Sequence, residues 1–255
     1  MFRTGSLENN RCGEDPYGWL RAIGPSFLLT LCASGGALAQ GTGTVASPSI
    51  KPGTSLSVAA GYAEEDGVWG EAHRVDVRHA VNARWRFGAM AFFNDRGGDY
   101  RYRRLALEVM HQFDTREPGW NSALQVRGRL PDGNEGPGRV RVAWLNRWRF
   151  NSGPELRLIG LASHEFGEDR AEGLRLETRS EATWRIGSDL RLGAQMFNRY
   201  NSTSEFGSFK SQRHAIGGVL KGPLSERLSY RLNALTGVSE AAADFEIRLR
   251  IRATL

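Results

Sequence analysis

The sequence predicts an all-β protein, an antiparallel up-and-down transmembrane β-barrel of about twelve strands behind an N-terminal signal peptide. Three observations predict it. From Ser55 onward, apolar and polar residues alternate with a period of two, which is typical of strands whose two faces meet different surroundings. Turn residues interrupt this pattern at regular intervals, and the connections are alternately short and long. Tryptophans stand next to the short connections, as in an interfacial aromatic girdle.

The first forty residues predict export. Arg21 precedes the apolar run AIGPSFLLTLCASGGALA, which ends in the small-x-small pattern of Ala37 to Ala39. We therefore expect a signal peptide over residues 1–39 that is cleaved after Ala39. The run is too short for a membrane-spanning helix and contains Gly and Ser. Both cysteines, Cys12 and Cys32, precede the expected cut, so the exported chain would lack thiols for disulfides, zinc-thiolate sites or cysteine catalysis.

The remaining chain divides into a lead-in and a barrel. Residues 40–53, QGTGTVASPSIKPG, predict a flexible periplasmic lead-in, and residues 54–255 predict the barrel. Strands are expected near 55–64, 70–82, 84–94, 100–113, 120–131, 138–150, 155–164, 173–186, 189–199, 211–221, 227–237 and 243–255. They average roughly 11 residues, the length that crosses a bilayer at a tilt.

The connections between these strands form two sets. The short set comprises residues 81–84, 114–119, 151–154, 187–189 and 222–226. The longer, polar and Gly-rich set comprises residues 64–71, 94–100, 131–138, 164–173, 198–211 and 237–243. Short turns at one end and long loops at the other are typical of membrane barrels with periplasmic turns and external loops. An even number of strands then places both ends of the barrel on the periplasmic side.

One face of the strands is apolar and the other is charged. In the last strand, FEIRLRIRAT, apolar residues alternate with a glutamate and three arginines. In a membrane barrel the apolar face meets lipid and the charged face lines the lumen. The arginines expected to line the lumen and set its selectivity are Arg84, Arg86, Arg104, Arg127, Arg129, Arg139, Arg141, Arg147, Arg149, Arg175, Arg179, Arg248, Arg250 and Arg252. The expected luminal acids are Glu108, Glu177, Glu181 and Glu246, and Asp76 and Glu155 share their parity.

A soluble sandwich or calycin-like barrel also fits this alternation, with the apolar face as its core and the arginines in solvent. Three features favour the membrane barrel: the girdle of Trp85, Trp120, Trp148 and Trp184 beside the short turns, further aromatics near the long loops, and an apolar face rich in Ala, Val and Leu. Four polar residues fit the lipid face poorly, namely His79, Asn146, Thr178 and Ser180. The strand near 211–221 has no clear parity, and His214 is compatible with either face.

With its expected signal peptide, amphipathic strands and alternating connections, the chain resembles bacterial outer-membrane β-barrel proteins as a class, with a small porin-like barrel. The resemblance covers residues 54–255 and is one of architecture, without a motif of a particular family. It implies insertion by the barrel-assembly machinery and contact with outer-membrane lipid. Members of the class commonly end on an aromatic residue, whereas this chain ends on Leu255.

The charge pattern points to transport. The formal net charge is +6, and arginine carries nearly all of the basic charge. We counted roughly three basic residues per acid on the charged face, and such an excess inside a narrow wall concentrates anions. The leading hypothesis is a passive outer-membrane channel for anions or small acidic solutes. The alternatives are a closed structural or adhesion barrel that acts through its outer loops, especially 198–211, and a soluble periplasmic β-protein.

No residue pattern favours catalysis or a cofactor. None of the five histidines shares a strand face with a serine at the spacing of a Ser–His pair. The acidic loop 164–173, with Glu165, Glu168, Asp169 and Glu172, matches no calcium-loop spacing. The basic residues alternate into a lumen and form no exposed patch for nucleic acid. We therefore expect no enzyme activity, no cofactor, no metal and no nucleic-acid partner.

Overall fold

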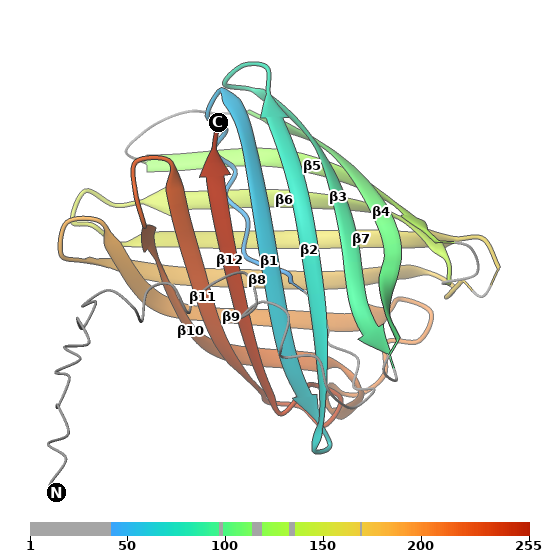
Figure 1. Ribbon diagram of the computed structural model, residues 1–255. Helices are drawn as coiled ribbons and strands as arrows, with labels where there is room; N and C mark the ends of the chain where they lie inside the picture. The colour runs from blue at the N-terminus through green and yellow to red at the C-terminus, as the bar shows by residue number, and fades with distance from the viewer. Residues whose placement is uncertain (1–41, 97–98, 114–118, 133–135, 169) are drawn as a thin grey trace, which may run out of the picture. The chain divides into compact units, whose positions relative to one another are not determined.

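The computed structural model describes residues 42–96, 99–113, 119–132, 136–168 and 170–255, and the expected signal peptide lies outside this part. The described residues belong to one compact unit. Twelve strands make up its described part (Figure 1): β1 Gly53–Glu65, β2 Val68–Ala80, β3 Trp85–Arg96, β4 Asp99–Gln112, β5 Gly119–Pro131, β6 Gly138–Arg149, β7 Glu155–Phe166, β8 Leu174–Ile186, β9 Leu190–Ser202, β10 Arg213–Pro223, β11 Leu228–Gly237 and β12 Phe245–Thr254. All twelve lie within a few residues of the ranges expected from the sequence.

The strands form one closed antiparallel barrel. Each strand pairs with the next along the chain, and β1 pairs with β12 to close the ring. The closing register runs from Ser55 opposite Thr254 to Glu64 opposite Phe245. Closure leaves no strand edge with unpaired backbone groups, which a strand inside a bilayer requires. The predicted fold class, a twelve-stranded up-and-down transmembrane barrel, is confirmed.

The two ends of the barrel differ in their connections. The turn end carries Gly53, the C-terminus and the connections after β2, β4, β6, β8 and β10; the loop end carries the others. Two loop-end connections are shorter than expected. β1 and β2 continue to a two-residue turn at Asp66 and Gly67, both with positive φ, because the Asp-Gly pair favours a tight hairpin. β3 and β4 likewise extend into the expected loop 94–100.

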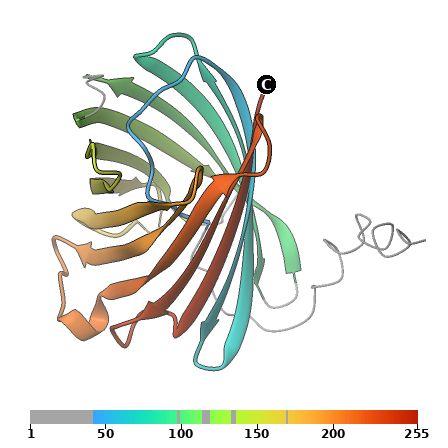
Figure 2. The same ribbon diagram turned by 90° about the vertical axis from the view of Figure 1, so that its left-hand side faces the viewer.

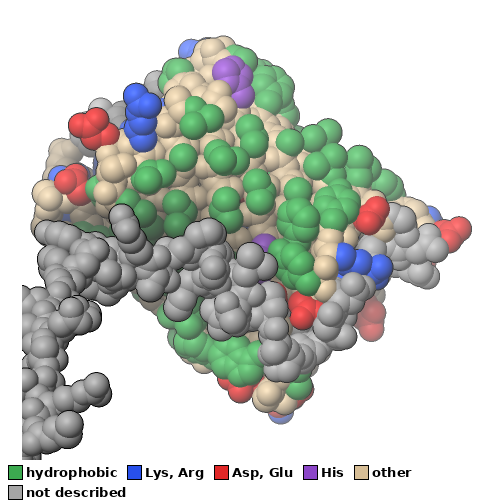
Figure 3. All heavy atoms as spheres, viewed as in Figure 1, with side chains coloured by type: hydrophobic (Ala, Val, Ile, Leu, Met, Phe, Trp, Pro, Cys, Tyr) green, Lys and Arg blue, Asp and Glu red, His purple; other side chains and the backbone are tan. Residues whose placement is uncertain are grey.

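The apolar face is the outer face of the barrel. Large side chains on it are well exposed, among them Val58 at 47%, Val77 at 47%, Leu107 at 53% and Trp144 at 56%. Figure 3 shows apolar side chains spread over the strands, with charged ones toward the margins. A soluble β-protein buries such a face, so this arrangement contradicts the soluble alternative. Among the described residues, no helix has the length and apolar character needed to span a membrane.

Three of the four polar residues that fit the lipid face poorly form hydrogen bonds with neighbours. Thr54 Oγ1 and His79 Nδ1 are 2.9 Å apart, and Trp120 Nε1 donates to Asn146 Oδ1 at 3.1 Å. Thr178 Oγ1 lies 3.0 Å from the hydroxyl of Tyr200. These cross-strand hydrogen bonds lower the cost of placing polar groups in an apolar belt. His214 is also on the outer face of β10, where it is buried under the ring of Phe209 at 4.5 Å between centroids.

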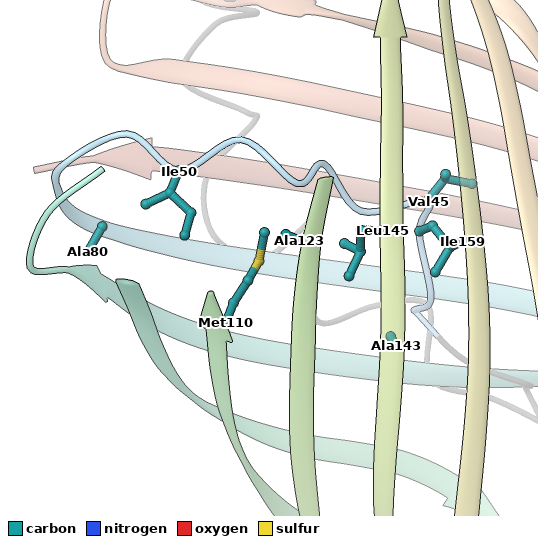
Figure 4. Close-up of a cluster of buried hydrophobic side chains, with 8 residues drawn as sticks. All are labelled: Val45, Ile50, Ala80, Met110, Ala123, Ala143, Leu145 and Ile159. Carbon is teal, nitrogen blue, oxygen red and sulfur yellow. The ribbon is translucent and has the colours of Figure 1, made fainter. Parts of the chain in front are cut away.

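The segment before β1 lies inside the ring of strands, which corrects the expectation of a flexible periplasmic lead-in over 40–53. Residues 42–52, here called the lumen segment, turn back from Gly53 into the barrel (Figure 2). Val45 and Ile50 are 1% and 7% exposed. They pack with Met110, Leu145 and Ile159 from the barrel wall (Figure 4). The sequence pattern does not reveal this because the segment has no strand or helix periodicity, and its docking depends on contacts with β4 to β8, β11 and β12.

Candidate functional site: the arginine-lined lumen

Most of the expected luminal arginines do point inward. On β12, Arg248 is buried and Arg250 and Arg252 are partly buried, whereas Leu249 and Ile251 on the other face are exposed. Arg86, Arg104, Arg127, Arg129, Arg139, Arg141, Arg179, Arg250 and Arg252 line the main cavity. Arg147 is buried, and Arg149 and Arg175 form ion pairs with inward-pointing glutamates. Arg84 is the exception, because it lies exposed in the β2–β3 turn, before the strand begins.

The luminal carboxylates lie behind the arginines and are shared among them. The side chain of Glu108 on β4 is 0% exposed and pairs with Arg78 at 2.8 Å, Arg86 at 3.3 Å and Arg127 at 2.7 Å. Its second oxygen also accepts a hydrogen bond from Gln125 at 3.0 Å. Such a buried carboxylate has both oxygens occupied, so it offsets the repulsion among its arginines and makes no direct contact with a solute in the lumen.

The same arrangement recurs around the barrel. Asp76 pairs with Arg74, Arg78 and Arg250. Three further acids each take two or three bases: Glu177 holds Arg141, Arg179 and Arg199; Glu181 holds Arg157, Lys221 and Arg231; and Glu165 holds Arg139 and Arg175. With Glu155 and Glu246, seven carboxylates among the described residues form ion pairs with at least fifteen basic side chains.

Some luminal residues differ from the sequence-based expectation. Glu165 is expected in an external acidic loop, but β7 continues past it and it points inward, 3% exposed. The sequence of β10 shows no clear parity, and the structure places Lys221 inside the barrel, 2.6 Å from Glu181. Phe92 and Phe197 also point inward, and each lies under two guanidinium groups, at 4.6 to 5.9 Å from the ring centroid. Their parity could have identified them, but neither was singled out as luminal.

The open space in the lumen is a cavity of about 640 Å³. Its wall in the described chain contains sixteen arginines and Lys221 but a single acid, Asp189. The arginines are Arg74, Arg78, Arg86, Arg104, Arg127, Arg129, Arg139, Arg141, Arg157, Arg179, Arg191, Arg199, Arg213, Arg231, Arg250 and Arg252. The space is therefore lined almost wholly by cationic groups, because the carboxylates that balance them lie deeper in the wall.

The lumen segment forms one side of this cavity and is held by arginines. Arg248 donates to the carbonyl of Gly43 at 2.7 Å, Arg179 to that of Thr44 at 3.3 Å, and Arg231 to that of Val45 at 3.0 Å. Arg157 also donates to Val45, and Arg250 to the Thr44 hydroxyl. The Ile50 amide donates to the Gln112 side chain at 2.8 Å. The arginines that hold the segment thus bind its oxygens in addition to their luminal carboxylates.

The four expected girdle tryptophans all lie at the turn end. Trp120 and Trp148 are direct cross-strand neighbours on β5 and β6. Trp85, Trp120 and Trp184 are 40%, 40% and 52% exposed. At the loop end, Trp69 and Tyr100 are 45% and 47% exposed. The two aromatic bands flank the apolar belt, as in membrane barrels.

This arrangement provides charge and space. Within the described ranges, no three His, Cys, Asp or Glu side chains are placed to hold a metal ion. The guanidinium groups are bidentate donors that bind carboxylate, phosphate and sulfate oxygens. The geometry therefore fits the binding and passage of anions.

Comparisons with known proteins bear on the fold. No protein-family model and no curated protein matches the sequence. Among solved structures, the barrel is similar to an outer membrane channel from Pseudomonas putida F1, with a TM-score of 0.64, 9% identity, and 81% of this chain and 97% of that chain covered. It is similar to the NanC porin, with a TM-score of 0.60, 12% identity, and 78% and 100% covered. It is also similar to the KdgM porin in complex with disordered oligogalacturonate, with a TM-score of 0.55, 8% identity, and 78% and 99% covered. The chain thus has the fold of outer-membrane channels.

Proposed function

We propose that this protein is an outer-membrane channel that passes anions or small acidic solutes by passive diffusion. The observation that carries the proposal is the cavity wall, with seventeen basic side chains and one acid among the described residues. Fixed positive charge in a narrow, low-dielectric lumen raises the local anion concentration and excludes cations. The exposed apolar belt and the aromatic bands support a place in the outer membrane, and the structural neighbours named as channels and porins support transport.

The lumen segment also supports a second candidate function, that of a closed barrel. Val45, Ile50 and the apolar side chains that they contact fill part of the turn-end half of the lumen. A barrel closed in this way would act through its outer loops and conduct no ions. The two proposals differ in one measurable property, which is conductance.

Planar bilayers with the purified barrel and a tenfold KCl gradient test the proposal. We expect ion conductance, with a reversal potential whose sign shows that the barrel is more permeable to chloride than to potassium. The variant Arg127→Glu/Arg141→Glu should shift that potential toward the potassium value, because it removes two positive charges from the wall and adds two negative ones. Arg84→Glu/Arg227→Glu, at two exposed positions in connections at the turn end, should leave it nearly unchanged. Cation selectivity in the unaltered barrel would overturn the proposal, and so would an absence of conductance both with and without the lumen segment.

A further inference from the structure

The loop-end half of the cavity contains four arginines in a compact square. Arg127 and Arg129 on β5 stand directly opposite Arg141 and Arg139 on β6. Cross-strand partners are roughly 5 Å apart and alternate residues of one strand about 6.6 Å apart. Like charges directly opposite one another destabilise a sheet. Two such pairs in succession therefore require compensation from acids in the wall or from a ligand.

The acids in the wall compensate this arginine square incompletely. Arg127 pairs with Glu108, Arg139 with Glu165 and Arg141 with Glu177. Arg129 donates to the carbonyl of Pro137 at 3.0 Å. The Nε–H groups of Arg127, Arg129 and Arg139 are buried and have no hydrogen-bond acceptor in the structure. The square keeps both excess charge and unused donors, and all four of its side chains line the cavity.

The space in front of the square is bounded on its far side. Residues Thr42 to Ala46 of the lumen segment line the same cavity. On β5 and β6, the apolar residues that contact Val45 and Ile50, such as Ala123 and Leu145, lie nearer the turn end than the square. A solute that enters from the loop end thus meets the square first and the lumen segment behind it. A cavity of about 640 Å³ matches a small-molecule site better than an extended groove.

We propose that this half of the lumen is a saturable binding site for a compact solute with two or more oxyanion groups, seated on Arg127, Arg129, Arg139 and Arg141. The inference rests on the proposed function and deepens it, since a passive anion channel needs no saturable site. The solute needs two or more charged groups because the square consists of two cross-strand arginine pairs, one beside the other along β5 and β6, and one charged group would contact only part of it. A compact solute is required because the lumen segment closes the space. Carboxylate and phosphate share the chemistry that the guanidinium groups recognise.

Calorimetric titration of the full barrel in detergent, at constant ionic strength, tests the site with sodium pyrophosphate, citrate and chloride. We expect saturable one-to-one binding of pyrophosphate, citrate or both, and none of chloride. Binding of only one of the two identifies the oxyanion type. The variant Arg129→Gln/Arg139→Gln should weaken this binding at least tenfold. Arg185→Gln/Arg227→Gln, with the same change in charge outside the square, should change it less than twofold.

Three results would overturn the inference. The first is a linear titration with no saturation. The second is equal affinity in the two double variants, when the gel shift on heating shows that both are folded. The third is tighter binding of long-chain polyphosphate than of pyrophosphate, as an open groove would produce. The inference and the proposed function fail separately. An anion-selective barrel without saturable binding refutes only the site. A barrel that binds pyrophosphate but conducts no ions refutes only the channel.

Discussion

Glu108 shows how single residues keep an arginine-rich lumen folded. Its buried carboxylate is shared by Arg78, Arg86 and Arg127. Replacing one partner of a buried ion pair leaves the other charges uncompensated, which costs about 3–5 kcal/mol. We expect Glu108→Gln to lower the free energy of unfolding by that order, measured by urea titration in detergent.

The matched control for Glu108 is an exposed glutamate. Glu240 pairs with Lys210 at 2.5 Å, and both side chains are at least 70% exposed. Solvent screens such a pair, so Glu240→Gln should change stability by only about 0–1 kcal/mol. An equal effect of the two substitutions would show that the carboxylate of Glu108 does not hold its arginines together.

The packing of β10 against β11 leaves no room for a side chain at Gly217. A Cβ atom there would lie 1.9 Å from the carbonyl oxygen of Ala234 on β11. Gly217→Ala should therefore destabilise the barrel by about 1–3 kcal/mol or more, because backbone must move. Gly160→Ala, where nothing lies within 4 Å, is the control and should be near neutral. The temperature at which the folded band disappears on gels measures both.

At the scale of elements, the lumen segment determines how much of the lumen is left open. Burial of Val45 and Ile50 contributes about 1.5–3 kcal/mol for each side chain. Five arginines add hydrogen bonds to its oxygens. These non-covalent contacts hold the segment in the lumen, so a change in the segment alone should alter the pore.

We expect removal of residues 42–50 to increase single-channel conductance several-fold, because the segment fills part of the lumen. Val45→Gly/Ile50→Gly should produce frequent transitions to the same larger conductance, since the segment then loses its apolar anchors. Lys51→Gly, exposed in the same segment, should behave as the unaltered barrel. Unchanged conductance after the deletion would mean that the ion path does not pass the segment.

At the scale of the whole molecule, the apolar belt determines where the barrel resides. Val142 near the middle of β6 is 42% exposed, and Val238 in the β11–β12 connection is 41% exposed. An arginine on the lipid face near the midplane costs about 2–4 kcal/mol, and one near the interface costs far less. We expect Val142→Arg to reduce the stability of the barrel folded into lipid vesicles by that amount. Val238→Arg should have little effect, and equal effects would place the belt in water.

The sequence by itself determined the strands, the barrel class and the inward face of most arginines. The period of two is a local property, and it survives because each strand of a membrane barrel separates lipid from lumen along its full length. The same parity correctly indicated Arg127, Arg141 and Arg250, since they lie in the middle of regular strands. It failed for Arg84, which lies in a turn, and for Glu165, where the strand continues beyond the expected loop.

Only the tertiary structure decided what occupies the lumen. The docking of residues 42–52 depends on side chains from β4 to β8, β11 and β12, which are distant in sequence. The sharing of each acid among two or three bases depends on strand register and on side-chain reach across neighbouring strands. Alternation specifies which face of its strand a residue occupies. Closure of the ring then places the inward faces of all the strands around one cavity, and this puts the excess positive charge and the lumen segment in the same space.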